Sequence, residues 1–204
     1  MIAPLPFAVL AVFCALALLR LGHHLKVWIH GREQGEFVGN REPVWVRFSW
    51  PALSFGLVVM VICYGFHHTS EISPWMRHFE LPIPDLIQWL ALALAVFSLA
   101  GLHWVHRALG HYFSASLSLR EGHQLIIDGP YAWVRHPMYA ALLGYFAGVA
   151  ILSANLAIIA FCVGISILLF RRIEREERML EERFGDLYRE YRTKTGRIVP
   201  RFWD

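Results

Sequence analysis

Long apolar runs set the hydrophobic pattern of this chain. Three of them have about the 20 apolar residues that a transmembrane helix needs; they cover residues 2–21, 48–66 and 86–102. A fourth run, residues 138–170, is too long for a single crossing and has its most polar point at Ser153-Ala154-Asn155. This point predicts a tight hairpin of two short helices, 138–153 and 155–170. The pattern therefore predicts an all-α integral membrane protein with about five transmembrane helices.

A pair of glycines predicts a helix contact in the fourth run. Gly144 and Gly148 form a GxxxG pattern, with Ala140 one turn earlier. Small residues at this spacing let helix backbones approach closely in lipid, so we expect this face to pack against another helix.

The composition agrees with a membrane setting. Hydrophobic residues make up 56% of the 204-residue chain and charged residues 17%, whereas soluble domains average about 45–50% and about 25%. No basic segment precedes the first run, so a cleaved secretory signal is not expected. The cysteines Cys14, Cys63 and Cys162 each lie in an apolar run without a CxxC partner, which predicts core positions rather than a disulfide or a metal site.

The distribution of Lys and Arg predicts the orientation. Five crossings put the loops 23–47 and 103–137 and the tail after residue 170 on one side, and this side collects seventeen of the nineteen basic residues. Of the other two, Arg77 lies on the opposite side and Arg20 lies at the end of the first run. We therefore expect an outside N-terminus and a cytoplasmic tail, in a plasma, inner or endoplasmic reticulum membrane. We expect residues 1–102 to form an N-terminal region of three spans, and residues 103–204 to form a second region with a loop, the helical hairpin and a cytoplasmic C-terminal helix.

Residue types that carry chemistry concentrate just before the predicted hairpin. Residues 122–139 read GHQLIIDGPYAWVRHPMY: a short β-like run at 124–127, a turn at Asp128-Gly129-Pro130, and then aromatic, cationic and imidazole side chains. A proline is tolerated in the first turn of a helix, and the free amides of such a turn, with a cation and an imidazole beside them, suit an anion. An interfacial belt of aromatic residues and arginine has the same composition, so both interpretations stand.

A second cluster, residues 171–191, reads as a helix that leaves the membrane. Arg171 and Arg172 lie at the boundary, and Arg172 shares a helix face with Glu176. A solvated charged helix has this composition too. However, the charge begins at the membrane surface on the side of the first cluster, and the hairpin returns the chain there. We expect the two clusters to form one cytoplasmic pocket from a loop and a C-terminal helix.

From about Gly110 to Pro200, a little under half of the chain, the sequence resembles the isoprenylcysteine carboxyl methyltransferase and phospholipid methyltransferase family of integral-membrane enzymes. The resemblance is carried by GPYAWVRHPMY at 129–139 and EREERMLEERFGDLYREY at 174–191. It implies methyl transfer from S-adenosylmethionine, with S-adenosylhomocysteine as product. The implied acceptor is lipophilic: an isoprenylcysteine-like carboxylate, a phospholipid or a thiol.

The resemblance also implies roles for individual residues. Those expected to bind the cofactor are His123, Gln124, Leu125, Ile126, Tyr131, His136, Pro137, Met138, Tyr139, Glu176 and Glu177. The residues expected on the catalytic, substrate side are Arg135 and Arg172. Which of the two adjacent glutamates contacts the cofactor depends on the alignment of the helix.

The chemistry of S-adenosylmethionine suits these residue types. A carboxylate such as Glu176 can hold its ammonium group, and His136 or helix-start amides can hold its carboxylate. Apolar and aromatic side chains before and within the turn can enclose the adenine. An acceptor carboxylate would be oriented by Arg135 or Arg172 without a general base, whereas an amine or a thiol would require one.

Other functions fit parts of the sequence. The eleven histidines suggest a di-iron oxygenase, but the spacing His103-x2-His106-x4-His111 does not repeat elsewhere. A sterol-type reductase that uses NADPH shares the architecture of the second half, although the proline after Arg-His and the Gly-Pro-Tyr turn favour a methyltransferase. The chain has no GxGxxG motif. A non-enzymatic scaffold is the remaining alternative. Nucleic acid is not an expected partner, because the basic tail alternates with acids at a membrane surface; the sequence does not give the oligomeric state.

Overall fold

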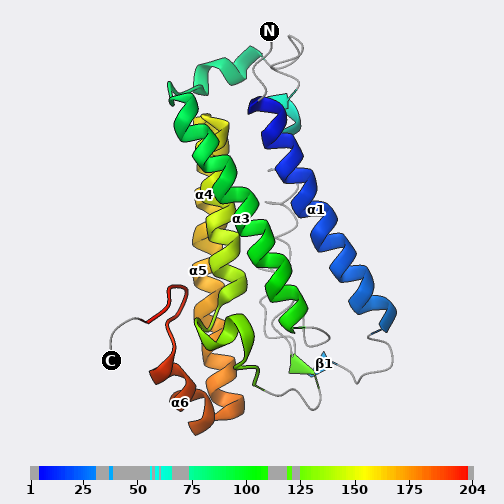
Figure 1. The fold of residues 1–204 in the computed structure, drawn as a ribbon, viewed down its shortest axis with the longest axis vertical. Helices are drawn as coiled ribbons and strands as arrows, with labels where there is room; N and C mark the ends of the chain where they lie inside the picture. The colour runs from blue at the N-terminus through cyan, green and yellow to red at the C-terminus, as the bar shows by residue number, and fades with distance from the viewer. Residues whose placement is uncertain are drawn as a thin grey trace.

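The computed structural model describes residues 5–30, 37–38, 56, 58–59, 61–65, 74–109, 119–120 and 125–201 (Figure 1). Its α-helices are α1 (Leu5–His30), α3 (Asp85–Leu109), α4 (Pro137–Ser153), α5 (Leu156–Phe184) and α6 (Asp186–Lys194). Two 3-10 helices, η2 (Pro74–Phe79) and η4 (Gly129–Ala132), precede α3 and α4. The two-residue strands β1 (Phe37–Val38) and β2 (Leu119–Arg120) pair antiparallel. Apart from these strands, the regular structure of the described chain is helical.

The four longest helices run along the long axis of the molecule, and η4, α6 and the C-terminal segment gather at its lower end (Figure 1). Helices α3 and α5 are long and apolar enough to cross a membrane; α4 and the part Phe7–Gly22 of α1 are shorter apolar helices. Large apolar side chains on α3 point outward, among them Phe97, which is 77% exposed. Such a surface is suited to lipid. The predicted span 48–66 lies mostly outside the described residues, so the number of crossings stays a prediction.

The predicted hairpin in the fourth apolar run is confirmed. Helix α4 ends at Ser153, Ala154 adopts a left-handed conformation with φ 46°, and α5 begins at Leu156. Asn155 is buried; its side chain accepts a hydrogen bond from the Ala157 amide at 3.1 Å and donates one to the Met76 carbonyl at 3.2 Å. The asparagine therefore caps α5 and ties the hairpin tip to η2.

The glycine pair packs α4 closely against α3, as expected. A Cβ atom on Gly148 would lie 2.8 Å from the Ala91 carbonyl oxygen and 2.9 Å from the Ala95 amide nitrogen. One turn earlier, a Cβ on Gly144 would lie 2.7 Å from the Ser98 hydroxyl. Because the α3 backbone itself fills the space beside Gly148, a larger residue there would push the helices apart.

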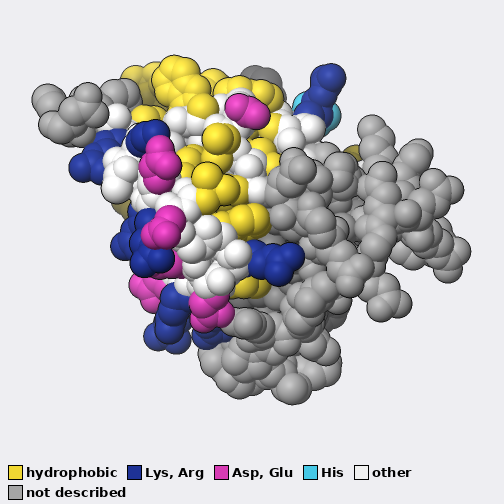
Figure 2. Space-filling view, turned by 90° about the horizontal axis from the view of Figure 1, so that it is seen from below, with side chains coloured by type: hydrophobic (Ala, Val, Ile, Leu, Met, Phe, Trp, Pro, Cys, Tyr) yellow, Lys and Arg dark blue, Asp and Glu magenta, His cyan; other side chains and the backbone are white. Residues whose placement is uncertain are grey.

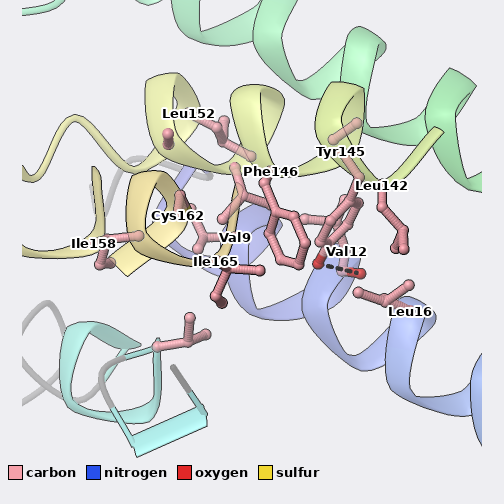
Figure 3. Packing of buried hydrophobic residues seen from close by; sticks show 14 of the residues in the cluster. Val9, Val12, Leu16, Leu142, Tyr145, Phe146, Leu152, Ile158, Cys162 and Ile165 are labelled. Carbon is pink, nitrogen blue, oxygen red and sulfur yellow. Dashed lines mark hydrogen bonds between the residues drawn. The ribbon is translucent and has the colours of Figure 1, made fainter. Parts of the chain in front are cut away.

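The core between α1, α4 and α5 is shown in Figure 3. Buried side chains from the three helices interdigitate: Val9, Val12, Leu16, Leu142, Tyr145, Phe146, Ile158, Cys162 and Ile165. Within this core the Tyr145 hydroxyl donates a hydrogen bond to the Val12 carbonyl at 3.3 Å. This bond fixes the level at which α1 lies against α4. The core position expected for Cys162 is confirmed, whereas Cys14 is exposed on α1, where that expectation is wrong.

The C-terminal segment departs from the prediction of one helix across residues 171–191. Helix α5 continues from the apolar run to Phe184 and stops at Gly185, whose φ of 53° is in the left-handed region that glycine adopts without strain. Helix α6 then runs from Asp186 to Lys194. The β-like run predicted at 124–127 is also wrong for its described part, since residues 125–127 have no regular structure.

Candidate functional site

The C-terminal tail returns to the sequence motif that precedes α4. The Arg135 amide donates to the Gly196 carbonyl at 2.9 Å, and the His136 amide donates to the Arg197 carbonyl at 3.0 Å. Val134 and Gly196 form a parallel bridge beside these bonds. A Cβ atom on Gly196 would lie only 1.7 Å from the Val199 carbonyl oxygen, so the turn of the tail requires glycine.

One carboxylate, that of Glu177, is the centre of the contacts between α5, the motif and the tail. Its Oε1 accepts from Arg135 Nε at 3.1 Å and also lies 3.1 Å from Arg135 Nη2 and 3.4 Å from His136 Nε2. Its Oε2 lies 3.0 Å from Arg197 Nη2. We call Glu177, Arg135, His136 and Arg197 the Glu177 network. It joins three segments that are far apart in the sequence.

Arg135 is bound on all sides of its guanidinium. Besides its contacts with Glu177, its Nη1 donates to the Arg192 carbonyl at 3.1 Å and to the Thr195 carbonyl. The side chains of Arg135 and Glu177 are only 9% and 10% exposed. In such a setting a charged pair requires satisfied hydrogen bonds, and both partners have them. Arg135 therefore fixes the end of α6 and the start of the tail against the motif.

Tyrosines surround the Glu177 network. The Tyr191 hydroxyl donates to the Tyr131 carbonyl at 2.5 Å, and the buried Tyr188 ring meets the Tyr191 ring edge-on at 6.2 Å. Burial raises the pKa of Tyr191 to about 12. Burial, and then the charge of Glu176, raise the pKa of Tyr131 well above its usual value. These hydroxyls therefore stay protonated at neutral pH.

A second group of polar side chains lies next to this network. Tyr139, in the first turn of α4, is buried and shares side-chain hydrogen bonds with Arg172 and Glu176 of α5. Its ring lies 5.6 Å from the ring of His136, centroid to centroid. We call Tyr139, Arg172 and Glu176 the Tyr139 group. Glu176 and its neighbour Glu177 therefore have different partners, because consecutive residues of a helix point about 100° apart.

One carboxylate oxygen of Glu176 lacks a hydrogen-bond donor among the described residues. Its Oε2 is buried and accepts no hydrogen bond from any residue that the structure describes. A buried acceptor without a donor costs about 1–3 kcal/mol. This oxygen is therefore suited to a donor that a ligand brings.

The exposed charges at the lower end differ from these interior contacts. Seen from below, Lys and Arg side chains lie beside Asp and Glu side chains (Figure 2). The pairs include Arg189–Asp186 at 3.1 Å and Lys194–Glu190 at 2.6 Å, all four side chains being more than half exposed. Exposed ion pairs contribute little to stability. These exposed pairs therefore add little to the stability of this end.

The structure divides the residues singled out in the sequence. Tyr131, Tyr139, Arg172 and Glu176 come together, whereas Arg135, His136 and Glu177 belong to the adjacent network. Of the others, Pro137 is buried, and Leu125, Ile126 and Met138 are partly buried. His123 and Gln124 lie outside the described residues.

Two arginines that interact with these groups, Arg197 and Arg20, were not predicted from the sequence. Arg197 lies beyond the motifs and gave no signal of its own, because its partner Glu177 is twenty residues away and faces it only after α6 has turned back. Arg20 did give a signal: it is the one charge in the first apolar run, and we expected it only to mark the end of that run. Electrostatically, Arg20 interacts with Arg172 and Tyr139.

The histidines do not form a metal site in the part of the chain that the structure covers. Of the three histidines considered above as part of a di-iron site, His103 is exposed and His106 is buried, and His111 lies outside the described residues. No group of three His, Cys, Asp or Glu residues that could hold a metal ion occurs among the described side chains.

Comparison with known proteins shows similarity to one family of methyltransferases. Residues 90–182 match the model of the isoprenylcysteine carboxyl methyltransferase (ICMT) family. The chain is 26% identical over 205 residues to protein-S-isoprenylcysteine O-methyltransferase of Schizosaccharomyces pombe, which covers 90% of this chain and 81% of that protein. It is 35% identical over 165 residues to the enzyme of the same name from Tribolium castaneum, covering 80% of this chain and 54% of that one.

A solved structure shares the fold. It is the eukaryotic intramembrane Ras methyltransferase ICMT, which matches with a TM-score of 0.60 at 21% identity, over 98% of this chain and 69% of that one. The matched family region, residues 90–182, contains Tyr139, Arg172 and Glu176. It contains neither Arg197 nor Arg20.

Proposed function

We propose that this chain is an integral-membrane methyltransferase of the isoprenylcysteine carboxyl methyltransferase type. In this proposal it transfers a methyl group from S-adenosylmethionine to the carboxylate of a lipophilic, prenylcysteine-like acceptor at the cytoplasmic surface of a membrane. The observation that supports this most is the Tyr139 group. It joins the two sequence motifs through an arginine and a glutamate at the end of the apolar part of α5. The names of the relatives supply the acceptor class.

The residues present fit S-adenosylmethionine. The buried Glu176 Oε2, which has no donor among the described residues, can accept from the ammonium of the cofactor's amino-acid end. The neighbouring Tyr131, which is partly buried, offers an aromatic wall for the adenine. When bound, the cofactor supplies an electrophilic methyl group: an acceptor oxygen forms the new bond to carbon while the carbon–sulfur bond breaks and its electron pair stays on sulfur.

The protein residues have simpler tasks in this proposal. Arg172 orients the acceptor carboxylate through its planar fork of N–H donors. Tyr139 holds Arg172 and Glu176 in fixed positions relative to each other. No general base is required, because a carboxylate is already ionised and the transfer releases no proton from it. Alignment of the reactants and exclusion of water supply the acceleration.

We assign Arg135 and Glu177 to positioning rather than to direct contact with cofactor or acceptor. Their polar atoms already bind one another, His136, Arg197 and two tail carbonyls. The network places His136, and with it the first turn of α4 that carries Tyr139. This division of roles modifies the expectation that Arg135 faces the substrate.

Ligand binding and turnover of the purified full-length protein test the proposed function. We expect S-adenosylhomocysteine to bind, and N-acetyl-S-farnesylcysteine to be methylated when labelled S-adenosylmethionine is supplied. Glu176→Gln should weaken S-adenosylhomocysteine binding about tenfold, because it removes a charge-assisted hydrogen bond. Glu174→Gln is the matched control: this glutamate lies on the same helix but is exposed. Binding of NADPH instead of S-adenosylhomocysteine would favour the reductase and contradict the proposal.

A further inference from the structure

Arg20 lies on the inward face of α1. Val9, Val12 and Leu16 of this helix are buried against α4 and α5, and Arg20 follows Leu16 by four residues, which places it on the same face. Arg20 is only partly exposed, whereas the next residue, Leu21, is 57% exposed. The leucine therefore faces outward and the arginine inward. A charged residue with this placement in a membrane protein marks a functional interior.

The packing of α1 on α4 sets the level of Arg20. Val12 is hydrogen-bonded to Tyr145, and the two helices run in opposite directions (Figures 1 and 3). Arg20 follows Val12 by eight residues, which is about 12 Å along α1. Pro137, the first residue of α4, precedes Tyr145 by the same number of residues. Arg20 thus lies level with the first turn of α4, where Tyr139 is. Its electrostatic interactions with Tyr139 and Arg172 agree with this register.

The charged side chains around the first turn of α4 favour the binding of an anion. Arg20 and Arg172 repel each other, and Glu176 is the acid that interacts with Tyr139 between them. Two guanidinium groups and one carboxylate leave a net positive charge on these described side chains. In a setting of low dielectric such repulsion is relieved when an anion binds between the cations. A carboxylate matches guanidinium groups in both charge and shape.

We propose that Arg20 is a second acceptor-binding residue, which together with Arg172 holds the carboxylate of the methyl acceptor near the end of the apolar part of α1, Phe7–Gly22. The inference rests on the proposed methyl transfer and extends it. It assigns the choice of acceptor to a residue outside the matched family region: an acidic lipophilic molecule is selected over a zwitterionic phospholipid or a neutral thiol. The acceptor's apolar tail then lies toward the lipid-facing side of α1.

The test uses full-length protein in nanodiscs and three variants. Arg20→Met removes the charge, Arg20→Lys keeps it without the planar fork, and Arg171→Met removes an exposed arginine at the same boundary as a control. For each, the KM for N-acetyl-S-farnesylcysteine and the Kd for S-adenosylhomocysteine are measured. The carboxamide of the same acceptor, which has no charge, serves as a competitor.

We expect Arg20→Met to raise the acceptor KM about tenfold or more, with the cofactor Kd within about twofold of the wild-type value. The preference for carboxylate over carboxamide should be lost in Arg20→Met, intermediate in Arg20→Lys and intact in Arg171→Met. This preference is a ratio within one protein, so partial misfolding does not alter it.

Three outcomes would overturn the inference. An unchanged acceptor KM and carboxylate preference in Arg20→Met would show that Arg20 does not meet the acceptor. A loss of S-adenosylhomocysteine affinity as large as the loss for the acceptor would assign Arg20 to the carboxylate of the cofactor. A folded wild-type protein that binds no S-adenosylhomocysteine and methylates nothing would reject the proposed function itself. The first two results leave methyl transfer intact, so the two failures are distinguishable.

Discussion

At the scale of single residues, the adjacent glutamates Glu176 and Glu177 of α5 have different contacts. Glu176 faces Tyr139 and keeps a buried oxygen without a donor among the described residues, whereas both oxygens of Glu177 are bound by cations. From the sequence alone, the assignment of Glu176 rather than Glu177 to the cofactor depended on the alignment of the helix. The difference comes from their partners: the bond between Arg135 and Glu177 spans 42 positions, and no local pattern determines such a pairing.

Glu177→Gln tests the positioning role. The substitution leaves Arg135, His136 and Arg197 close together without their shared anion, and we expect it to destabilise the fold by about 2 kcal/mol, less than for a fully buried pair because Arg197 is partly exposed. Amide hydrogen exchange should accelerate at residues 135–136, whose amides bond to the tail. Thermal unfolding in detergent and exchange measured by mass spectrometry provide the readouts.

The control for this prediction is Glu190→Gln, because Glu190 is also ion-paired, with Lys194 at 2.6 Å, but on the exposed surface of α6. We expect no measurable change there. If Glu177→Gln left stability and exchange unchanged while weakening S-adenosylhomocysteine binding, Glu177 would be a cofactor residue and the positioning role would be rejected.

At the scale of elements, the sequence predicted correctly those features that depend on a few neighbouring residues. The hairpin could be located because Ser153-Ala154-Asn155 is the polar point of a long apolar run, and the contact of α4 because small residues recur on one face. The break at Gly185 was missed: the charged pattern continues across it, and only the left-handed glycine separates α5 from α6. The return of the tail could not be predicted, because it depends on where α6 directs the chain.

Helix packing at Gly148 gives a prediction at this scale. Gly148→Ala places a methyl group 2.8 Å from a backbone carbonyl of α3, which cannot move without shifting the helix, so we expect a destabilisation of about 1–3 kcal/mol. Gly164→Ala, in α5, is the matched control, since a Cβ there meets no atom within 4 Å. Thermal unfolding of the two variants compares them directly. Equal stability of both variants would mean that α3 and α4 do not pack closely at this point.

At the scale of the whole molecule, the groups proposed to act on cofactor and acceptor collect at one end. The hairpin tip and η2 lie at the opposite end, joined by the bridge between Glu80 and Asn155 (Figure 1). Helix α1 runs from the end of the molecule that carries η2 to the end that carries α6, and α3 starts at the η2 end again (Figure 1). This alternation is what five crossings require. The excess of Lys and Arg at the α6 end predicts that this end is cytoplasmic.

Single cysteines at the two ends test this orientation. In a protein whose own cysteines are replaced, Glu80→Cys and Glu190→Cys both put a thiol at an exposed position, the first beside the hairpin tip and the second on α6. A maleimide that cannot cross membranes should label Glu80→Cys in intact cells and Glu190→Cys only after permeabilisation. The reason is that basic residues resist translocation and stay on the cytoplasmic side. Labelling of Glu190→Cys in intact cells would place the Tyr139 group on the outer surface, away from cytoplasmic S-adenosylmethionine, and the proposed reaction would have no supply of its methyl donor.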